Sequence, residues 1–354
     1  MRMIRKSLII YFTLVVFLIL VFTMQSFAQP EYKWRFTMPW ERELSSESFE
    51  LFCHLVGVYS DGRIEIEYFP HGLLGTLDEN FHAIQAGEIE LGLSYTFANL
   101  VPGGVVALMP FSVSSWDEMA FACRRPDGFL YKVTNVAWEE VGVHLLFMAP
   151  QGFLGFANNV RPLKTPDDLK NLRLRVSGSL QLVEMLENMG KGTGMTMNTL
   201  PWADAYGAFE RGVLDGGWTG IAQMVEERHF EVQKYFTDLR FSHDLSCIII
   251  NKDIWDELPD DLKEAIEKAI KITTERDFEA HRRGEIEFRN ILKDMGAEVY
   301  YPTDEERSLW IEKARVPEIW ENLAKPWLDK AFPGQNMVET LLEEVENMKK
   351  YVAE

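Results

Sequence analysis

The sequence predicts an α/β protein of two lobes with a ligand cleft between them. The chain has 354 residues, which is enough for two ordinary domains, and its 47% hydrophobic and 26% charged residues are typical of a globular protein. Segments with strand and helix patterns alternate along most of it, and one helical segment is unusually long. Open sheets of such proteins place ligands at strand ends, in the crevice between lobes.

Residues 32–94 alternate between strand and helix patterns. Tyr32–Met38 and Arg63–Phe69 alternate in polarity, which predicts strands, and Ser45–Tyr59 has apolar residues at helical spacing. Phe81–Ala86 predicts a short helix, and Ile89–Ser94 predicts a buried strand. This order favours α/β layering with largely parallel strand pairing.

The same alternation continues after residue 116. We expect the following elements: a helical stretch at Trp116–Val136 broken around Pro126, strands at Val143–Met148, Gly155–Asn158, Leu172–Val176 and Cys247–Asn251, a helix start at Thr165–Leu169, and helices at Leu180–Met189 and Trp202–Glu210.

The last third of the chain is mostly helical. Pro259–Lys293 contains a single glycine and is too long for most helices of one domain, so we expect it to underlie more than one domain. Further helices are expected from Thr303 onward. We expect these helices to contact the core through Trp310, Trp320, Trp327 and Phe332.

Residues 1–28 have the pattern of a signal peptide. Three basic residues precede an almost wholly apolar run at residues 7–24, and Ser26-Phe27-Ala28 offers small residues at a cleavage site before Gln29. An uncleaved anchor is the alternative, because the run approaches the roughly 18 to 20 residues that span a bilayer. Either way, we expect the remaining chain to be exported.

The charge and the cysteines exclude several classes of protein. Residues 1–28 hold three basic and no acidic residues, so their removal takes the net charge from −19 to −22, which disfavours a nucleic-acid partner. Cys53, Cys123 and Cys247 lie far apart among apolar residues, which indicates buried thiols and not a disulfide framework.

The seven histidines lack metal-ligand spacing, and HExxH, CxxC, G-x-S-x-G and Walker motifs are absent, so we expect no metal, no cofactor and no catalysis.

The stretch NLRLRVSGS places two arginines on one strand face. Leu172, Leu174 and Val176 would share the buried face of the strand. Arg173 and Arg175 would then share the other face, which is either solvated or part of a cleft that binds an anion. Local pattern alone does not separate these alternatives.

Several stretches, in order along the chain, resemble the extracytoplasmic solute-binding subunits of TRAP (tripartite ATP-independent periplasmic) transporters. They are residues 69–75 (FPHGLLG), 84–91 (IQAGEIEL), 159–170 (NVRPLKTPDDLK), 174–176 (LRV), 214–216 (LDG), 231–235 (EVQKY) and 251–259 (NKDIWDELP). The resemblance implies a type II-like periplasmic binding protein with a central ligand cleft and a long helix that spans both lobes. It also implies an organic-acid ligand and membrane permease subunits as partners.

The resemblance suggests the following division. The signal peptide is residues 1–28, lobe I is residues 29–150 plus about 240–280, lobe II is residues 151–239 plus about 281–330, and a helical tail occupies residues 331–354.

The resemblance assigns the ligand carboxylate to Arg175, which occupies the arginine position of the family's I-R-V strand. A planar guanidinium donates two parallel hydrogen bonds to a carboxylate and stays charged at any working pH. Arg173 falls where the family varies, so we expect it to be solvated or to support the site from outside. The alternative for Arg175 is an ion pair with a carboxylate of the same protein.

Two departures from the family pattern bear on the ligand. A second arginine that many members place in an N-G-F-R stretch is Leu154 here, although Gln151 of the same stretch is still able to form hydrogen bonds with a ligand or to act as a simple strand-end polar residue. A subgroup that binds oxo-acids has E-W-x-G where this chain has Gly217 and Trp218. Trp218 then matches an aromatic wall or packs in the core. The loss of the acidic residue argues against a metal-bridged ligand.

The remaining site candidates follow strands. Trp40 and Glu41 follow the first strand, and Tyr95 and Phe97 follow the strand that ends at Ser94. His243 and Asp244 precede the last strand and are the most loosely aligned candidates.

The sequence therefore predicts a periplasmic receptor that captures a small organic monocarboxylate and delivers it to TRAP permease subunits. Loss of the second arginine argues against ligands that need two anion contacts. The alternatives are a secreted enzyme that acts on an organic acid in the same cleft and a ligand sensor.

Overall fold

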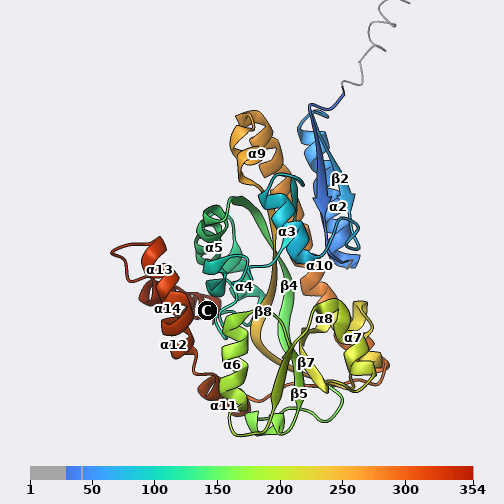
Figure 1. The fold of residues 1–354 in the computed structure, drawn as a ribbon, viewed down its shortest axis with the longest axis vertical. Helices are drawn as coiled ribbons and strands as arrows, with labels where there is room; N and C mark the ends of the chain where they lie inside the picture. Colours follow the sequence, from blue (N-terminus) through green and yellow to red (C-terminus); the bar gives the residue numbers. More distant parts are fainter. Residues whose placement is uncertain (1–28, 41–42, 354) are drawn as a thin grey trace, which may run out of the picture.

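The computed structural model of the protein describes residues 29–40 and 43–353. Two predictions, the signal peptide at residues 1–28 and the site residue Glu41, lie outside the described residues. One mixed sheet runs through the described part in the order β2-β1-β3-β8-β4-β7-β5-β6, with β9 beside β8. Helices pack around this sheet (Figure 1). The α/β prediction is confirmed.

One wing of the sheet forms the first lobe. Its strands and helices are β1 (Tyr32–Thr37), β2 (Ile64–Phe69), β3 (Leu91–Ser94), α2 (Glu43–Tyr59) and α3 (Leu77–Gln85). Strand β1 pairs in parallel with both β2 and β3. Helix α2 buries Phe49, Phe52 and Val56 against this wing, which is the face that the helical spacing predicts.

Two long antiparallel strands form the centre of the sheet. Strand β4 (Val143–Asn158) pairs with β8 (Tyr235–Asn251) along almost its whole length. The sequence predicted two short strands in place of β4 and only the last residues of β8. Both predictions were too short because the strands are buried on both faces and carry register shifts, so no regular alternation marks them.

The other wing forms the second lobe. Its elements are β5 (Arg173–Val176), β6 (Thr196–Thr199), β7 (Gly216–Gly220), α6 (Leu180–Gly190), α7 (Trp202–Glu210) and α8 (Ile221–Glu226). The sequence did not predict β6, which is polar and exposed, or β7, which is rich in glycine. Glycine is required at Gly216, because a Cβ there would lie 2.1 Å from the carbonyl oxygen of Ala157.

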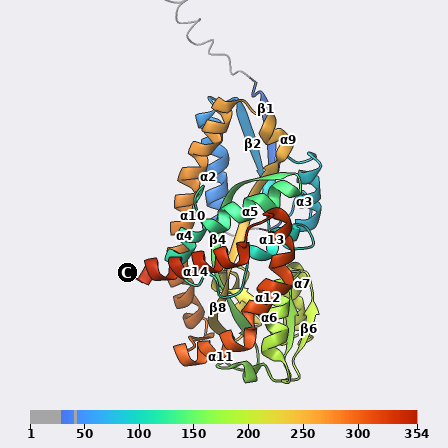
Figure 2. The same cartoon turned by 90° about the vertical axis from the view of Figure 1, so that its left-hand side faces the viewer.

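Helix α10 (Asp260–Asp294) runs along both lobes, as predicted (Figure 2). It contacts α2 of the first lobe, α8 of the second lobe and the central strand β4. We propose that the division of the chain into lobes follows the two wings, with β4, β8 and α10 shared between them.

The other elements complete the layers. They are α4 (Trp116–Cys123), α5 (Phe129–Glu140), α9 (Lys252–Glu257), β9 (Glu298–Tyr300), α11 (Asp304–Ala314), α12 (Val316–Ile319), α13 (Lys325–Ala331), α14 (Met337–Ala353), 3₁₀ turns at Pro102–Val106, Pro166–Leu169 and His229–Glu231, and a π-helical turn at Trp320–Ala324. Trp310, Trp320 and Trp327 are buried, which confirms them as core contacts. Within residues 29–40 and 43–353, no helix combines the length and apolar character needed to cross a membrane.

A buried ion network ties the central strand β8 to helix α10. Strand β8 bulges at residues 238–241, because Thr237 and Ser242 pair with β4 and the residues between them do not. Asp238 accepts a hydrogen bond from Arg289 at 3.0 Å. Glu285 accepts one from the indole of Trp116 at 2.6 Å and pairs with both Arg240 and Arg289.

We predict that Glu285→Gln lowers the free energy of unfolding by about 3 kcal/mol, because it removes the charge that two partly buried arginines share. Urea denaturation measures this change. The matched control on the same helix is Glu279→Gln, whose carboxylate is half exposed and lies 3.8 Å from Arg283. This variant should stay within about 0.5 kcal/mol of wild type. Equal effects of the two variants would show that the network does not stabilise the fold.

Candidate functional site

Arg175 projects from β5 on the face opposite the buried aliphatic residues. Leu174 and Val176 are 0% and 2% exposed in the core, as the alternation predicts. Arg175 is also buried, at 6% exposure. Its Nε donates a hydrogen bond to the carbonyl oxygen of Leu200 at 2.8 Å, and its guanidinium lies 5.1 Å from the ring centroid of Trp202.

The charge of Arg175 is not neutralised by an ion pair with any described residue. Burial lowers its pKa to about 10, which Glu227 partly opposes through its negative charge. Arg173 is different, because it is half exposed and forms a bidentate pair with Asp215 at 3.0 and 2.6 Å. Among the described residues, an internal ion pair is therefore found for Arg173 and not for Arg175.

Trp202 supports Arg175 and was missed by sequence analysis. It is the first residue of α7, and its indole nitrogen donates a hydrogen bond to Glu227. The ring of His229 stacks on the indole, with centroids 4.6 Å apart and planes 15° apart. Burial lowers the pKa of His229. No local pattern reveals these contacts, because Arg175, Trp202 and His229 come from three separate segments.

Several predicted residues meet in a second cluster. Tyr95 stacks on Phe97 with ring centroids 5.4 Å apart and also contacts Trp40 at 5.7 Å. The Tyr95 hydroxyl lies 3.0 Å from Oδ1 of Asp244 and 3.3 Å from Oε1 of Gln151. The structure therefore brings all five of these candidates together, with an aromatic side and a polar side.

Helix α8 connects this cluster with Arg175. Gln223, which sequence analysis missed, donates a hydrogen bond to Asp244. Glu227 caps the same helix one turn later and contacts Trp202. Residues four apart on a helix face the same side, about 5–6 Å apart, so the two clusters border a common region.

Two predicted residues point elsewhere. Gly217 is paired with Arg175, so Trp218 lies on the opposite face of β7, where it belongs to the main hydrophobic cluster. Its role as a ligand wall stays a prediction, and its position agrees with the packing alternative. His243 adjoins Asp244 on β8 but is 0% exposed and lies beside the backbone of Ala107, away from the cluster.

The loops that follow β3 and β5 meet at the rim of this region. A Cβ built on Gly178 of the second lobe would lie 3.5 Å from Oδ1 of Asn99 in the first lobe. The two loops therefore leave room for about one methyl group between them, beside the strand that holds Arg175.

Ser45, His281 and Asp277 lie close together but do not form the triad of a hydrolase, because Nδ1 of His281 lies 2.9 Å from the backbone carbonyl oxygen of Asp277. Ser45 Oγ lies 3.3 Å from His281 Nε2, and His281 Nδ1 lies 3.4 Å from Asp277 Oδ1. All three are buried between α2 and α10, at 0%, 3% and 1% exposure, and Ser45 Oγ also accepts a hydrogen bond from Gln151 at 3.3 Å. A substrate has no access to this serine.

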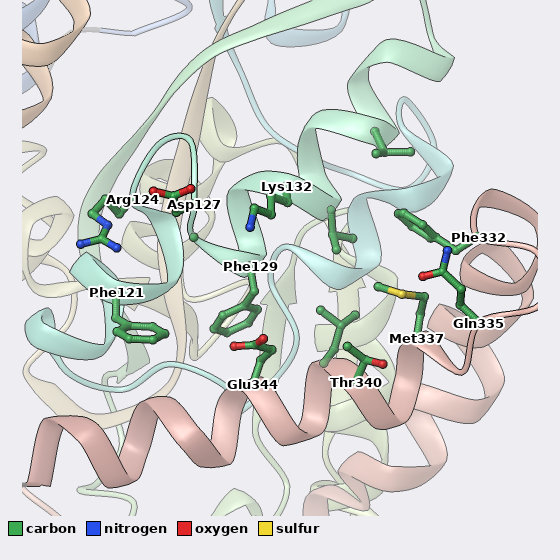
Figure 3. Close-up of a pocket in the computed structure, with 14 residues that line it drawn as sticks. Phe121, Arg124, Asp127, Phe129, Lys132, Phe332, Gln335, Met337, Thr340 and Glu344 are labelled. Atoms are coloured by element: carbon green, nitrogen blue, oxygen red, sulfur yellow. The ribbon is translucent and has the colours of Figure 1, made fainter.

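A cavity of about 340 Å³ lies between α5 and α14. Figure 3 shows Phe129 on its floor, with Lys132 and Glu344 on opposite sides of that ring. None of the predicted site residues lines this cavity. No cluster of His, Cys, Asp or Glu suited to a metal ion occurs in the described part of the chain.

Comparisons with known proteins agree on one family. The DctP family, described as bacterial extracellular solute-binding protein, family 7, matches residues 39–325. The C4-dicarboxylate-binding periplasmic protein DctP of Rhodobacter capsulatus is 26% identical over 266 residues, which are 74% of this chain and 77% of that protein.

Solved structures share the fold. A TRAP periplasmic solute-binding protein from Roseobacter denitrificans with bound β-D-glucuronate has a TM-score of 0.77 at 23% identity, covering 87% of this chain and 98% of its own. Another from Desulfovibrio salexigens with bound orotic acid has a TM-score of 0.78 at 20% identity, covering 90% and 99%. The two-lobed architecture predicted from the sequence is confirmed.

The burial of His243 predicts a pH-dependent stability. Burial lowers its pKa to about 4, so the unfolded chain binds a proton near pH 6.5 that the folded protein does not. The free energy of unfolding should fall as the pH falls from 6.5 towards 4, by about 3 kcal/mol from this group. Above pH 6.5 the group should contribute no pH dependence.

His243→Leu isolates this contribution, because leucine is apolar and does not titrate. Urea denaturation of both proteins at pH 7.5 and 4.5 measures it, and wild type should lose more stability than the variant on acidification. Parallel losses in the two proteins would contradict the prediction.

Proposed function

The chain belongs to the DctP family, the bacterial extracellular solute-binding proteins of family 7, and on that premise we propose that it captures a small organic monocarboxylate in the periplasm. The loaded protein then delivers this acid to TRAP permease subunits in the membrane. Binding involves no covalent chemistry.

Arg175 carries this proposal. Its guanidinium is buried, stacks on Trp202 and makes no ion pair with any described residue. A buried charge that lacks a counter-ion is unfavourable, and a carboxylate with two parallel hydrogen bonds compensates for it. The same strand offers a comparison, since Arg173 already has its counter-ion in Asp215.

The other side chains of the region support a monocarboxylate as the ligand. Leu154 of β4 stands where many family members have a second arginine, and it offers no charge to a second anionic group. Trp40, Tyr95 and Phe97 present aromatic surface suited to an apolar ligand body. Gln151 and Asp244 add polar contacts that would orient an oxo or hydroxyl group.

Lobe closure provides the transport signal in this proposal. Arg175 belongs to the second lobe, and Tyr95 belongs to the first, so a ligand that contacts both stabilises the closed form by its differential affinity for that form. The approach of Gly178 to Asn99 supports a closed rim at this position. Permease subunits would then recognise the closed protein.

We predict that Arg175→Ala weakens ligand binding at least about thirtyfold, because the variant leaves the carboxylate buried without a cation. Mass spectrometry of acid released from the purified protein identifies the ligand, and calorimetry measures its affinity. Arg173→Ala is the matched control on the same strand and should bind within about threefold of wild type, because Arg173 is exposed. Unchanged binding by Arg175→Ala would refute the proposed site.

We also predict that monocarboxylates raise the melting temperature of the protein more than dicarboxylates of the same length. A second carboxylate would lose its hydration without gaining a cation from position 154, where this chain has leucine. A thermal-shift panel of oxo-, hydroxy- and aromatic monocarboxylates against dicarboxylates such as succinate tests this. Equal stabilisation by succinate would contradict the monocarboxylate class while leaving Arg175 as the anchor.

A further inference from the structure

We propose that Trp202 is a positioning residue for ligand binding, whose indole holds the Arg175 guanidinium so that its Nη1–Nη2 edge receives the ligand carboxylate. The inference rests on the proposed function, because it takes Arg175 as the carboxylate-binding group. It adds the orientation of the contact and the residue that sets this orientation.

The protein itself occupies the other approaches to the guanidinium. A carboxylate pairs in a bidentate manner either with Nε and one terminal nitrogen or with both terminal nitrogens. In Arg175 the Nε–H already donates to the carbonyl oxygen of Leu200 at 2.8 Å. The guanidinium carbon also lies over the indole ring of Trp202, 5.1 Å from the ring centroid. Neither terminal nitrogen forms a hydrogen bond with a described residue.

One short segment supplies both constraints. Leu200 and Trp202 lie two residues apart, between the end of β6 and the start of α7. Strand β6 runs parallel to β5 with Asn198 paired with Arg175, so the segment emerges at the same edge of the sheet as the arginine. The backbone thus holds Nε, and the ring two residues later lies against the guanidinium group.

The indole is itself held in place by a second set of contacts. Its nitrogen donates to Glu227, and His229 stacks on its ring at 4.6 Å. The His229 ring is 2% exposed and lies against the rings of Tyr206 and Phe209, with centroids 5.8 and 5.9 Å away. A ring held by a hydrogen bond and a stack has little freedom to rotate, so it offers Arg175 a fixed surface.

The test observes Arg175 directly in the ligand-free protein. Exchange of its Nε–H with water is measured by ¹⁵N NMR in wild type, Trp202→Phe and Trp202→Leu. Phenylalanine keeps an aromatic face but loses the hydrogen bond to Glu227, whereas leucine loses both. We expect Trp202→Leu to speed the exchange at least tenfold and Trp202→Phe to have a smaller effect.

Trp255→Leu is the matched control. Trp255 is also half-buried, stacks on a histidine, His144, at 4.6 Å, and has a cation, Lys263, 5.8 Å from its ring centroid. It lies in α9, outside the two clusters. Trp255→Leu therefore reports the general cost of losing such a ring, and Arg175 exchange should stay at the wild-type rate.

Acetate serves as the binding probe, because it offers only a carboxylate. Its affinity, measured by calorimetric titration in every variant, should fall roughly fivefold in Trp202→Leu. The fall should vanish in an Arg175→Lys background, since lysine lacks the planar group that the indole orients. Unchanged exchange and acetate affinity in Trp202→Leu would overturn the positioning role and leave the proposed function intact. Failure of Arg175→Ala to weaken ligand binding would instead overturn the proposed function.

Discussion

The antiparallel pairing of β4 with β8 is the constraint on which the rest of the structure depends. These two strands carry the sheet from one lobe into the other, and each wing is built outward from them. Backbone hydrogen bonding between the register shifts holds each segment of the pair together, and the shifts interrupt the ladder at three places along it. The pair therefore joins the lobes, and we propose that its register shifts are where one lobe bends relative to the other.

The candidate site lies beside this pair. Gln151 belongs to β4 and Asp244 to β8, so both occupy fixed positions between the lobes. Arg175 comes from the second wing and Tyr95 from the first. Helix α8 connects their surroundings, because Gln223 is hydrogen-bonded to Asp244 and Glu227 to Trp202. A ligand that contacts these groups senses the angle between the lobes, because the groups that hold it belong to different wings.

Sequence alone predicted the parts of this arrangement that depend on local pattern or on family motifs. The α/β order, the long helix and the inward face of β5 all follow from periodicity, and Arg175 follows from the I-R-V motif. The full lengths of β4 and β8 could not be predicted from the sequence, because strands buried on both faces show no alternation of polar and apolar residues. Trp202 and Gln223 were not predicted as site residues either, because they join the site through contacts between segments that are distant in the sequence. The face of the sheet on which Trp218 lies could not be predicted either, since only the register between β5 and β7 shows it.

An acidic protein that binds an acid needs a short-range attraction stronger than its long-range repulsion. The chain has a net charge of −19, but salt screens that repulsion beyond roughly 10 Å. Burial removes water from the charged guanidinium of Arg175, and this loss of hydration lowers its pKa. A carboxylate that reaches the guanidinium relieves this penalty, and closure strengthens the pair further by excluding water from around it. In the function that we propose, charge pairing and lobe closure therefore stabilise each other, and the exposed Arg173, already paired with Asp215, has no part in this coupling.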